Sequence, residues 1–321
     1  MGEKIATRAA YGDALKKYGK ENPRVIVLDA DLSGATYSNR FAKEVPERFL
    51  NCGIAECNMV GIAAGLATTG KIPFIHSFAM FAAGRVYDQV RNSVAYPHLN
   101  VKIVGTHAGL SVGEDGATHQ CVEDIALMRV IPGMTVVNPC DAVEADAAVK
   151  AVMDYEGPCY LRIGRNPVDV VMDQIPGYHF ELGKGVLLRE GTDVAILATG
   201  IMVQEALKAE EALKAEGISA RVINIHTIKP IDRDIILQAA RDCGVIVTSE
   251  EHNVMAGFGS AVAEVVSEAY PVPVVRHGVN DVFGRSGAAQ QVLDAYGVNA
   301  GGIVEAVHRA LALKRVQGAA R

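Results

Sequence analysis

The stretch GTHAGLSVGEDGATHQ, residues Gly105–Gln120, decides the fold class. It follows the apolar segment Val101–Gly105, which predicts a buried strand, and it precedes Val122–Val130, which predicts a helix. A polar loop between a buried strand and a helix is expected at the carboxyl edge of a parallel sheet, where ligands bind in such folds. This loop contains four glycines, two histidines and two acids, which are residue types that do not suit a hydrophobic core. We therefore interpret it as a ligand-binding segment. A passive glycine-rich turn is the alternative.

Strand and helix patterns alternate on both sides of this loop. The expected strands of the first half are Val25–Leu28, Pro73–Phe78, Val101–Gly105, Thr135–Val137 and Tyr160–Ile163. The expected helices are Ala6–Tyr18, Glu56–Ala67, Arg85–Val94, Val122–Val130 and Ala142–Met153. Such alternation predicts a parallel sheet whose strands are linked by helical crossovers.

A break in this rhythm divides the chain. Residues 164–186 contain two prolines and show no helical period, which favours a connector or a small hairpin. A second run follows, with expected strands Val194–Ala198, Arg221–Ile225, Val245–Ser249 and Val272–Arg276, and expected helices Met202–Ala215, Asp232–Asp242, Gly259–Ala269, Ala288–Tyr296 and Gly302–Leu313. We therefore predict an α/β fold of two α/β domains with mainly parallel sheets, residues 1–182 and 183–321.

Composition excludes several classes of function. The 321 residues include 31 Lys and Arg against 37 Asp and Glu, a net charge of −6, so no global field attracts nucleic acid or an anionic membrane. No apolar run approaches the ~20 residues that span a bilayer. The six cysteines lack C-x-x-C spacing, which favours buried thiols in a reducing cytoplasm.

Two further clusters carry candidate functional residues. Glu56 lies in NCGIAECN, Asn51–Asn58, at the start of an apolar helix. This acid is either a helix N-terminal charge or a buried carboxyl for proton exchange. Phe78 and Phe81 leave the end of a predicted strand, and they are either core residues or an aromatic platform for a flat heterocycle.

Together these motifs resemble the carboxyl-terminal half of transketolase, a thiamine-diphosphate-dependent family, over essentially all 321 residues. The most specific part is T-H-x-x-L-S-V-G-E-D-G-x-T-H-Q at Thr106–Gln120, supported by A-T-R at Ala6–Arg8 and A-D-L at Ala30–Leu32. I-x-E at Ile54–Glu56 and F-x-x-F at Phe78–Phe81 are similar to the family's pyrimidine-binding pattern. The later segment SEEHNVMAGFGS, residues 249–260, resembles the family's carboxyl-terminal domain.

The resemblance implies a cofactor-binding set. An acid at the position of Glu56 hydrogen-bonds a ring nitrogen of the cofactor's aminopyrimidine and supports proton removal from the thiazolium carbon. Phe78 and Phe81 are expected to form the pocket that stacks the pyrimidine, and Ile54 to pack on the cofactor. Asp31 is expected to help position it.

The resemblance also implies a substrate-binding set. Arg8, His107 and Arg165 are expected to hold the terminal phosphate of a sugar phosphate, a task that suits the fork of an arginine. Asp115 is expected to meet a substrate hydroxyl. His119 is expected to assist proton transfer near the reacting carbon, which makes it, with Glu56, the predicted catalytic pair.

The sequence departs from the family pattern at three places. Ala35 stands where transketolases usually carry a serine that contacts phosphate, and Ala83-Gly84 stands where a third aromatic residue is expected. The interval from Asp31 to Glu56 is shorter than in full-length transketolases and closer to that of deoxyxylulose-phosphate synthases. These differences bear on the sugar more than on the cofactor.

A missing motif predicts a partner. Thiamine-diphosphate enzymes anchor the diphosphate and its metal with G-D-G followed by Asn, whereas Gly12-Asp13 is followed by Ala14 within a helical pattern. Without compensating cations the phosphates stay unneutralised in a low-dielectric cleft. We therefore expect the carboxyl-terminal subunit of a split transketolase, inactive alone, in a heterotetramer with two copies of each chain. A separate amino-terminal subunit with the G-D-G motif would bind Mg²⁺ or Ca²⁺, and this chain would supply no metal ligand.

Other functions are also compatible with these residues. Half of a 1-deoxyxylulose-5-phosphate synthase, or the β subunit of a 2-oxoacid dehydrogenase, shares the expected fold and the acid at Glu56. A non-catalytic regulatory partner of the same fold is a further possibility, although the presence of Glu56, His107, Asp115 and His119 together argues against lost chemistry. A metal enzyme built on the nine histidines is least favoured, because no His-x-x-x-His spacing supports it.

Overall fold

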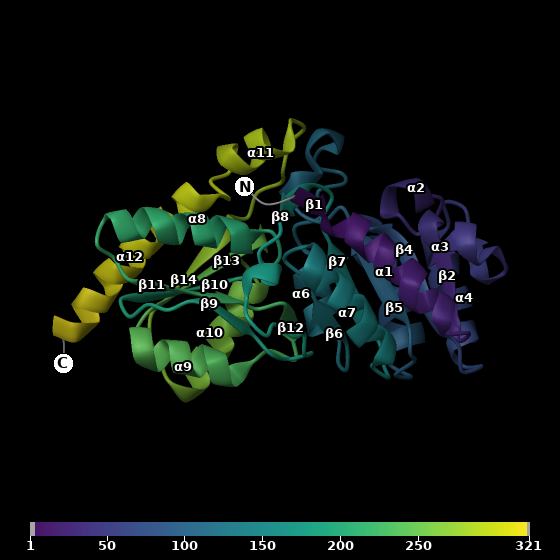
Figure 1. The fold of residues 1–321 in the computed structure, drawn as a ribbon, viewed down its shortest axis with the longest axis horizontal. Coiled ribbons are helices and arrows are strands. Elements are labelled where there is room, and N and C mark those ends of the chain that lie inside the picture. The colour runs from purple at the N-terminus through teal and green to yellow at the C-terminus, as the bar shows by residue number, and fades with distance from the viewer. Residues whose placement is uncertain (1–3, 320–321) are drawn as a thin grey trace.

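Two sheets with helices on both faces lie end to end in the computed structural model, which describes residues 4–319. Figure 1 shows the early part of the chain, in purple and blue, forming one half of an elongated molecule. The later part, in green and yellow, forms the other half. The expected α/β architecture with mainly parallel sheets is confirmed. None of the helices in the described part of the chain combines the length and the apolar character that crossing a membrane requires.

The first sheet has seven strands in the order β12-β6-β7-β5-β4-β2-β3. All its pairings are parallel except that of β12 with β6. Every residue of β4 is buried, as expected for a strand covered on both faces. The strands are β2 (Val25–Asp29), β3 (Phe49–Asn51), β4 (Ile72–Phe78), β5 (Lys102–Thr106), β6 (Thr135–Val137), β7 (Cys159–Ile163) and β12 (Thr227–Lys229).

Helices cover both faces of this sheet because side chains alternate along each strand. Phe74 packs with Leu15 under one pair of helices, α1 and α7, whereas Ile75 packs with Met59 and Val90 on the other face. The helices of this half are α1 (Thr7–Glu21), α2 (Ser33–Thr36), α3 (Asn39–Glu44), α4 (Glu56–Ala67), α5 (Tyr87–Gln89), α6 (Asp124–Val130) and α7 (Ala142–Asp154). Wide π-helical turns at Met80–Arg85 and Val90–Ala95 flank α5, and 3₁₀ turns occupy Pro46–Arg48, Leu110–Asp115 and Met172–Gln174.

The second sheet has five strands in the order β14-β13-β10-β11-β9, parallel except at the edge strand β9. Figure 1 shows α8 and α12 on one side of it and α9 and α10 on the other. The strands are β9 (Val186–Arg189), β10 (Val194–Ala198), β11 (Ala220–Asn224), β13 (Ile246–Asn253) and β14 (Val274–Val279). The helices are α8 (Met202–Ala215), α9 (Arg233–Cys243), α10 (Phe258–Ala269), α11 (Ala289–Ala295) and α12 (Ala300–Ala319).

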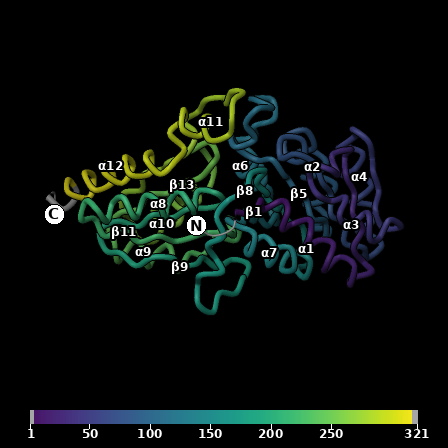
Figure 2. The backbone as a smooth tube through the Cα atoms, turned by 45° about the horizontal axis from the view of Figure 1, so that its top comes forward, coloured from purple at the N-terminus to yellow at the C-terminus, as the bar shows by residue number. Residues whose placement is uncertain are grey.

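The two halves are joined by strand β12 and by a buried arginine, Arg162. Strand β12 comes from the later half but pairs with β6, and Arg162 of β7 bonds both Asp124 at 2.8 Å and the Glu251 carbonyl at 2.9 Å. The first described strand, β1 (Lys4–Ala6), pairs antiparallel with β8 (Pro167–Asp169) at the same junction (Figures 1 and 2). The bond from Arg162 to the Glu251 carbonyl is buried and links β7 of the first sheet to β13 of the second.

Several local expectations need correction. The chain is helical from Met80, before the expected start at Arg85, because wide turns follow β4 directly. Residues 164–186 form no hairpin of their own, since Pro167–Asp169 pairs with β1. Four cysteines are buried as expected, but Cys57 is exposed and Cys52 is half-buried. The domain boundary after residue 182 stays a prediction, and β12 beyond it joins the first sheet.

Candidate functional site

The candidate residues gather at one edge of the first sheet. Strands β2, β3, β4, β5 and β7 run parallel, so the loops that leave their carboxyl ends all lie along this edge. Those loops carry, in chain order, Asp31, Ile54 with Glu56, Phe78 with Phe81, the segment His107–His119, and Arg165. Arg8 joins them from the first turn of α1. An edge of this kind is where open α/β sheets bind ligands.

Four rings form a continuous aromatic cluster at this edge. Phe78 stacks on His107 with ring centroids 4.0 Å apart, and Phe81 lies 6.3 Å from Phe78 in a near-parallel arrangement. His119 meets Phe81 edge-on at 5.2 Å. The structure therefore brings together two phenylalanines and two histidines that the sequence analysis assigned to different ligands. Such a cluster offers flat apolar surface beside polar ring nitrogens.

Glu56 is buried beside this cluster and pairs with an arginine. It is the first residue of α4, where the helix dipole favours an acid, and its side chain is 3% exposed. Oε1 accepts a hydrogen bond from Arg85 Nη1 at 2.8 Å. The guanidinium carbon of Arg85 lies 4.2 Å from the centre of the Phe81 ring. The carboxyl is therefore linked to the aromatic cluster through Arg85, a residue that the sequence analysis did not single out.

His107 is held as a neutral ring. Burial first, and then the nearby Arg8, Arg165 and His119, lower its pKa to about 3. Arg8 Nη1 lies 3.4 Å from His107 Nε2, and a guanidinium has no acceptor, so Nε2 accepts. The proton is then on Nδ1, which donates to Thr106 Oγ1 at 3.0 Å. His107 also has a positive φ of 55°, a strained backbone of the kind that persists at functional sites.

Arg8 and Arg165 are positioned by backbone carbonyls. Arg8 donates from Nε to the Arg165 carbonyl at 2.9 Å and from Nη1 to the Ala35 carbonyl at 2.8 Å. Burial and the neighbouring Arg165 lower the pKa of Arg8, while Tyr37 raises it. The three predicted phosphate ligands are thus neighbours. Ala35 takes part through its carbonyl oxygen, although it lacks the serine hydroxyl.

Asp115 lies next to the same arginine. Arg165 Nη1 is 3.7 Å from Asp115 Oδ2 and 3.2 Å from Glu114 Oε2, and it also donates to the Val112 carbonyl. The two acids are exposed, so their pairing with Arg165 is screened by solvent and weak. An incoming anion can replace them without uncovering a buried charge.

Support for this loop comes from the other half of the molecule. Glu251 of β13 accepts from the Ser111 backbone N–H and, at 3.2 Å, from Ser111 Oγ. Gly109 adopts a φ of 78°, and a Cβ there would lie 2.4 Å from the Glu251 carboxyl carbon, so only glycine fits. Burial raises the pKa of Glu251 to about 7. Sequence offered no signal for this role, because the partners are far apart in the chain.

Two predicted cofactor residues stand apart from the cluster. Asp31 is exposed, has a φ of 63°, and accepts from Asn51 Nδ2 at 2.9 Å. The acid that holds this loop is the buried Asp29, whose carboxylate accepts from Leu32 N and the Ser38 hydroxyl. Ile54 is 79% exposed, so in this chain it packs on little.

The missing third aromatic residue has a packing explanation. Ala83 is fully buried among core residues, which leaves no room for a ring. At Gly84 a Cβ would lie 2.3 Å from the terminal methyl of Met80. Met80 therefore fills the space that a side chain at position 84 would need.

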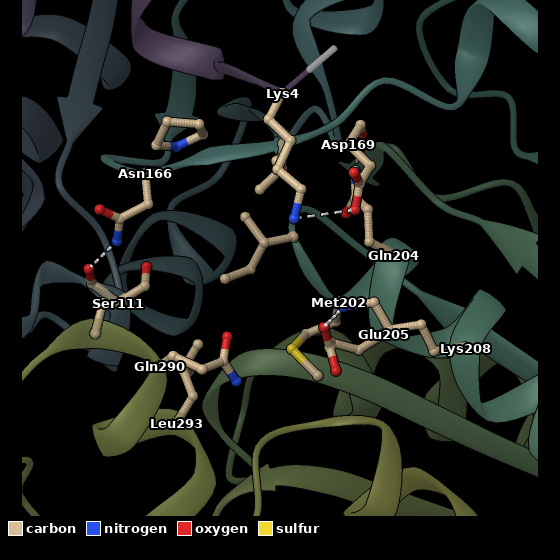
Figure 3. A pocket seen from close by; sticks show the side chains of 14 residues that line it. Lys4, Ser111, Asn166, Asp169, Met202, Gln204, Glu205, Lys208, Gln290 and Leu293 are labelled. Atoms are coloured by element: carbon tan, nitrogen blue, oxygen red, sulfur yellow. Dashed lines mark hydrogen bonds and ion pairs between the residues drawn. The ribbon is translucent and has the colours of Figure 1, made fainter. Parts of the chain in front are cut away.

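Two cavities lie near the candidate residues. One, of about 690 Å³, opens beside Phe81, Arg85 and the exposed Phe283. The other, of about 250 Å³, lies at the junction of the two halves, where Asn166 bonds the Ser111 carbonyl and Lys4 pairs with Asp169 (Figure 3). The aromatic cluster touches the first cavity, so that cavity is the candidate cofactor entrance.

The donor set fits one end of thiamine diphosphate. A ring platform next to a buried carboxyl suits an aminopyrimidine, which is flat and carries hydrogen-bonding nitrogens. Within residues 4–319 no three His, Cys, Asp or Glu side chains are grouped to hold a metal ion. The residues present therefore fit the heterocycle and give no counterpart for the metal and diphosphate.

Comparisons with known proteins match both parts of the chain. The family model described as the transketolase pyrimidine-binding domain matches residues 3–169, and the transketolase carboxyl-terminal domain matches residues 183–303. A putative transketolase carboxyl-terminal section of Methanocaldococcus jannaschii is 50% identical over 301 residues, covering 94% of each chain.

Two other similar proteins are informative. A 6-deoxy-6-sulfo-D-fructose transketolase subunit of Clostridium sp. is 47% identical over 304 residues, covering 94% of this chain and 93% of the relative. A solved structure described as a split gene transketolase, inactive beta4 tetramer, is 55% identical with a TM-score of 0.90. The match covers 97% of this chain and 99% of that one.

Proposed function

Because this chain belongs to the transketolase family, as the carboxyl-terminal subunit of a split transketolase, we propose that it forms half of an active site for two-carbon ketol transfer. The donor would be a ketose phosphate and the acceptor an aldose phosphate. The observation that carries the proposal is the buried Glu56 carboxyl beside the stacked rings of Phe78 and Phe81.

The pyrimidine end of thiamine diphosphate would be held by these residues. Phe81 would provide the stacking face and Phe78 its support, while Glu56 would bond the heterocycle's nitrogen edge in a dry site. Ile54 would pack on the cofactor, and Asp31 would act from the adjacent loop. The chemistry that the cofactor supplies in this family is a nucleophilic thiazolium carbon.

His119 and Asp115 would handle the substrate's hydroxyl groups. His119 Nδ1 lies 2.9 Å from Thr118 Oγ1, so we assign proton movement to the other ring nitrogen, Nε2. Asp115 would accept a hydrogen bond from a hydroxyl on the sugar. Both residues leave the same loop that Glu251 holds in place, so their positions depend on that contact.

Arg8, His107 and Arg165 would bind the distant anionic end of the sugar. The two arginines bring the positive charge, because His107 is neutral at physiological pH. Phosphate suits two guanidinium groups, since each presents a fork of donors. A sulfonate is the alternative anion, supported by the sulfosugar named for the Clostridium relative.

A separate amino-terminal subunit would complete the site. It would bring the G-D-G motif, Mg²⁺ and the diphosphate grip, since the described residues of this chain offer no metal cluster. We propose a heterotetramer with two copies of each chain, inactive without the partner. The similar solved protein, described as an inactive beta4 tetramer, supports both self-association and the need for a second chain.

Reconstitution tests the proposal. The chain is mixed with its amino-terminal subunit, thiamine diphosphate and Mg²⁺, and two-carbon transfer between a ketopentose phosphate and an aldopentose phosphate is followed by mass spectrometry. Transfer should appear only in the mixture. Glu56→Gln should lower turnover by roughly 10²–10⁴-fold, the usual share of general acid–base catalysis, whereas the exposed Glu47→Gln should not.

Two results would overturn parts of this account. Release of CO₂ from pyruvate in place of ketol transfer would favour the synthase alternative. Unchanged turnover in Glu56→Gln would favour a non-catalytic role for this chain.

A further inference from the structure

Arg85 makes two contacts at once. Its guanidinium lies over the Phe81 ring, with the carbon 4.2 Å from the ring centre. The same group donates from Nη1 to Glu56 Oε1 at 2.8 Å. The Phe81 ring and the Glu56 carboxylate both stabilise this planar, charged guanidinium, the ring by stacking and the carboxylate by accepting a hydrogen bond.

These two contacts are the ones that a bound aminopyrimidine would need. A flat heterocycle on the Phe81 face, with its nitrogen edge toward Glu56, would use the same ring face and the same carboxyl oxygen. Two planar groups cannot stack on one ring face in the same place. Arg85 therefore stands where the heterocycle is expected.

Burial indicates which member of the pair can move. Glu56 is 3% exposed, whereas the Arg85 side chain is 45% exposed and borders the open cavity of about 690 Å³. Arg85 also ends the wide turn Met80–Arg85, and such π-helical turns are frequent at functional sites. The guanidinium can leave for solvent at small cost, while Glu56 stays fixed on α4.

We propose that Arg85 occupies the pyrimidine subsite of the free chain and must leave Glu56 and Phe81 before the cofactor's ring can enter. This inference rests on the proposed function, because it takes thiamine diphosphate as the ligand. Arg85 keeps the buried Glu56 carboxylate paired while the subsite lacks a ring, since an unpartnered buried charge is strongly destabilising. The arginine stabilises the cofactor-free chain and lowers its affinity for the cofactor.

The size of the effect follows from the competing equilibrium. If the subsite is free of Arg85 in only about one tenth of the molecules, the apparent dissociation constant for thiamine diphosphate is raised about tenfold. Removing the side chain removes this cost. Arg91 provides a matched control, because it is an exposed arginine in the next wide turn, Val90–Ala95, and its side chain bonds only that of its neighbour Asn92 among the described residues.

The test is calorimetric titration of thiamine diphosphate with Mg²⁺ into the complex with the amino-terminal subunit. Arg85→Ala should bind about tenfold more tightly than wild type, and Arg91→Ala should match wild type. Arg85→Lys, which keeps the charge but loses the planar stack, should fall between them. Equal or weaker binding by Arg85→Ala would overturn the proposal, because Arg85 would then be neutral toward the cofactor or would help to hold it.

A second readout uses the full chain alone. The thermal midpoint of Arg85→Ala should fall, since Glu56 loses its partner, whereas that of Arg91→Ala should stay at the wild-type value. An unchanged midpoint in Arg85→Ala would contradict the pairing role. If the wild-type complex binds no thiamine diphosphate at all, the proposed function fails and this inference fails with it, an outcome distinct from binding that ignores Arg85.

Discussion

His107 shows how burial decides the charge of a single residue at the site. Its pKa of about 3 leaves the ring neutral, because the ring is buried and two arginines lie close by. Nε2 already accepts from Arg8 and Nδ1 donates to Thr106. The ring therefore orients Arg8 more than it attracts an anion. In the proposed function, the charge that binds a phosphate would come from Arg8 and Arg165.

Arg8→Ala tests this division of roles. In the reconstituted enzyme, kcat/KM for phosphorylated sugars should fall roughly 10- to 100-fold, which corresponds to the loss of about 1.5–3 kcal/mol from hydrogen bonds to a charged group. Values for unphosphorylated sugars should change little, because they never use this contact. Steady-state kinetics with a matched pair of sugars measures the difference.

The exposed Arg24 supplies the control for Arg8. It lies just before β2 and outside the candidate site, so Arg24→Ala should keep the wild-type preference for phosphorylated sugars. An equal loss on both classes of sugar in Arg8→Ala would mean that Arg8 supports the loop and does not read the phosphate.

Functional residues that lie in one short sequence motif can be predicted from the sequence. Residues that act through partners far away in the chain cannot. His107, Asp115 and His119 lie within one sequence motif, so recognising that motif predicts all three residues. Arg85 and Glu251 act on residues 29 and 140 positions away. No local pattern signals such contacts, and only the folded sheet brings them together.

At the scale of elements, strand β13 of the later half holds a loop of the earlier half. Glu251 at its end bonds Ser111, and Arg162 of β7 bonds the Glu251 carbonyl. The position of the 3₁₀ turn Leu110–Asp115 therefore depends on how β13 packs against the first sheet. A change in that contact should reach Asp115 and His119 on the same loop.

Glu251→Gln should alter how stability depends on pH. Burial raises the pKa of Glu251 from 4.5 to about 7, so between these values the folded chain keeps a proton that the unfolded chain releases. The contribution of Glu251 to stability is therefore present below about pH 4.5 and is lost as pH rises to about 7. The loss reaches ~1.4 kcal/mol per pH unit. Wild type should lose more stability than Glu251→Gln between pH 5 and pH 7.5.

Urea denaturation of both proteins at a series of pH values provides the measurement. Burial also raises the pKa values of Glu144 and Glu250 to about 7. Their contributions cancel when the free energy of unfolding of the variant is subtracted from that of wild type at each pH. The exposed Glu47→Gln is the control and should run parallel to wild type. Parallel curves for Glu251→Gln as well would show that this carboxyl does not titrate in that window.

Long apolar strands were predictable, and short exchanged strands were not. The buried run of β4 and the apolar β10 carry their own pattern. In contrast β1, β8 and β12 have three residues each and pair with strands far away in the sequence, so nothing near them in sequence specifies a partner. The wide turns after β4 were missed because their apolar spacing resembles that of an ordinary helix.

At the scale of the whole molecule, we propose that the chain forms half of an active site. Strand β12 and the bond from Arg162 to the Glu251 carbonyl link its two units, and the four rings of the aromatic cluster all lie on the earlier unit. The described residues hold no group suited to a metal ion. We propose that the chain carries the surface for the heterocycle and that another subunit holds the opposite end of the cofactor.

Calorimetric titration of thiamine diphosphate with Mg²⁺, first into the chain alone and then into its mixture with the amino-terminal subunit, tests this division most directly. Weak or undetectable binding by the chain alone, and saturable binding with turnover by the mixture, is the predicted result. Tight, magnesium-dependent binding with turnover by the single chain would contradict it.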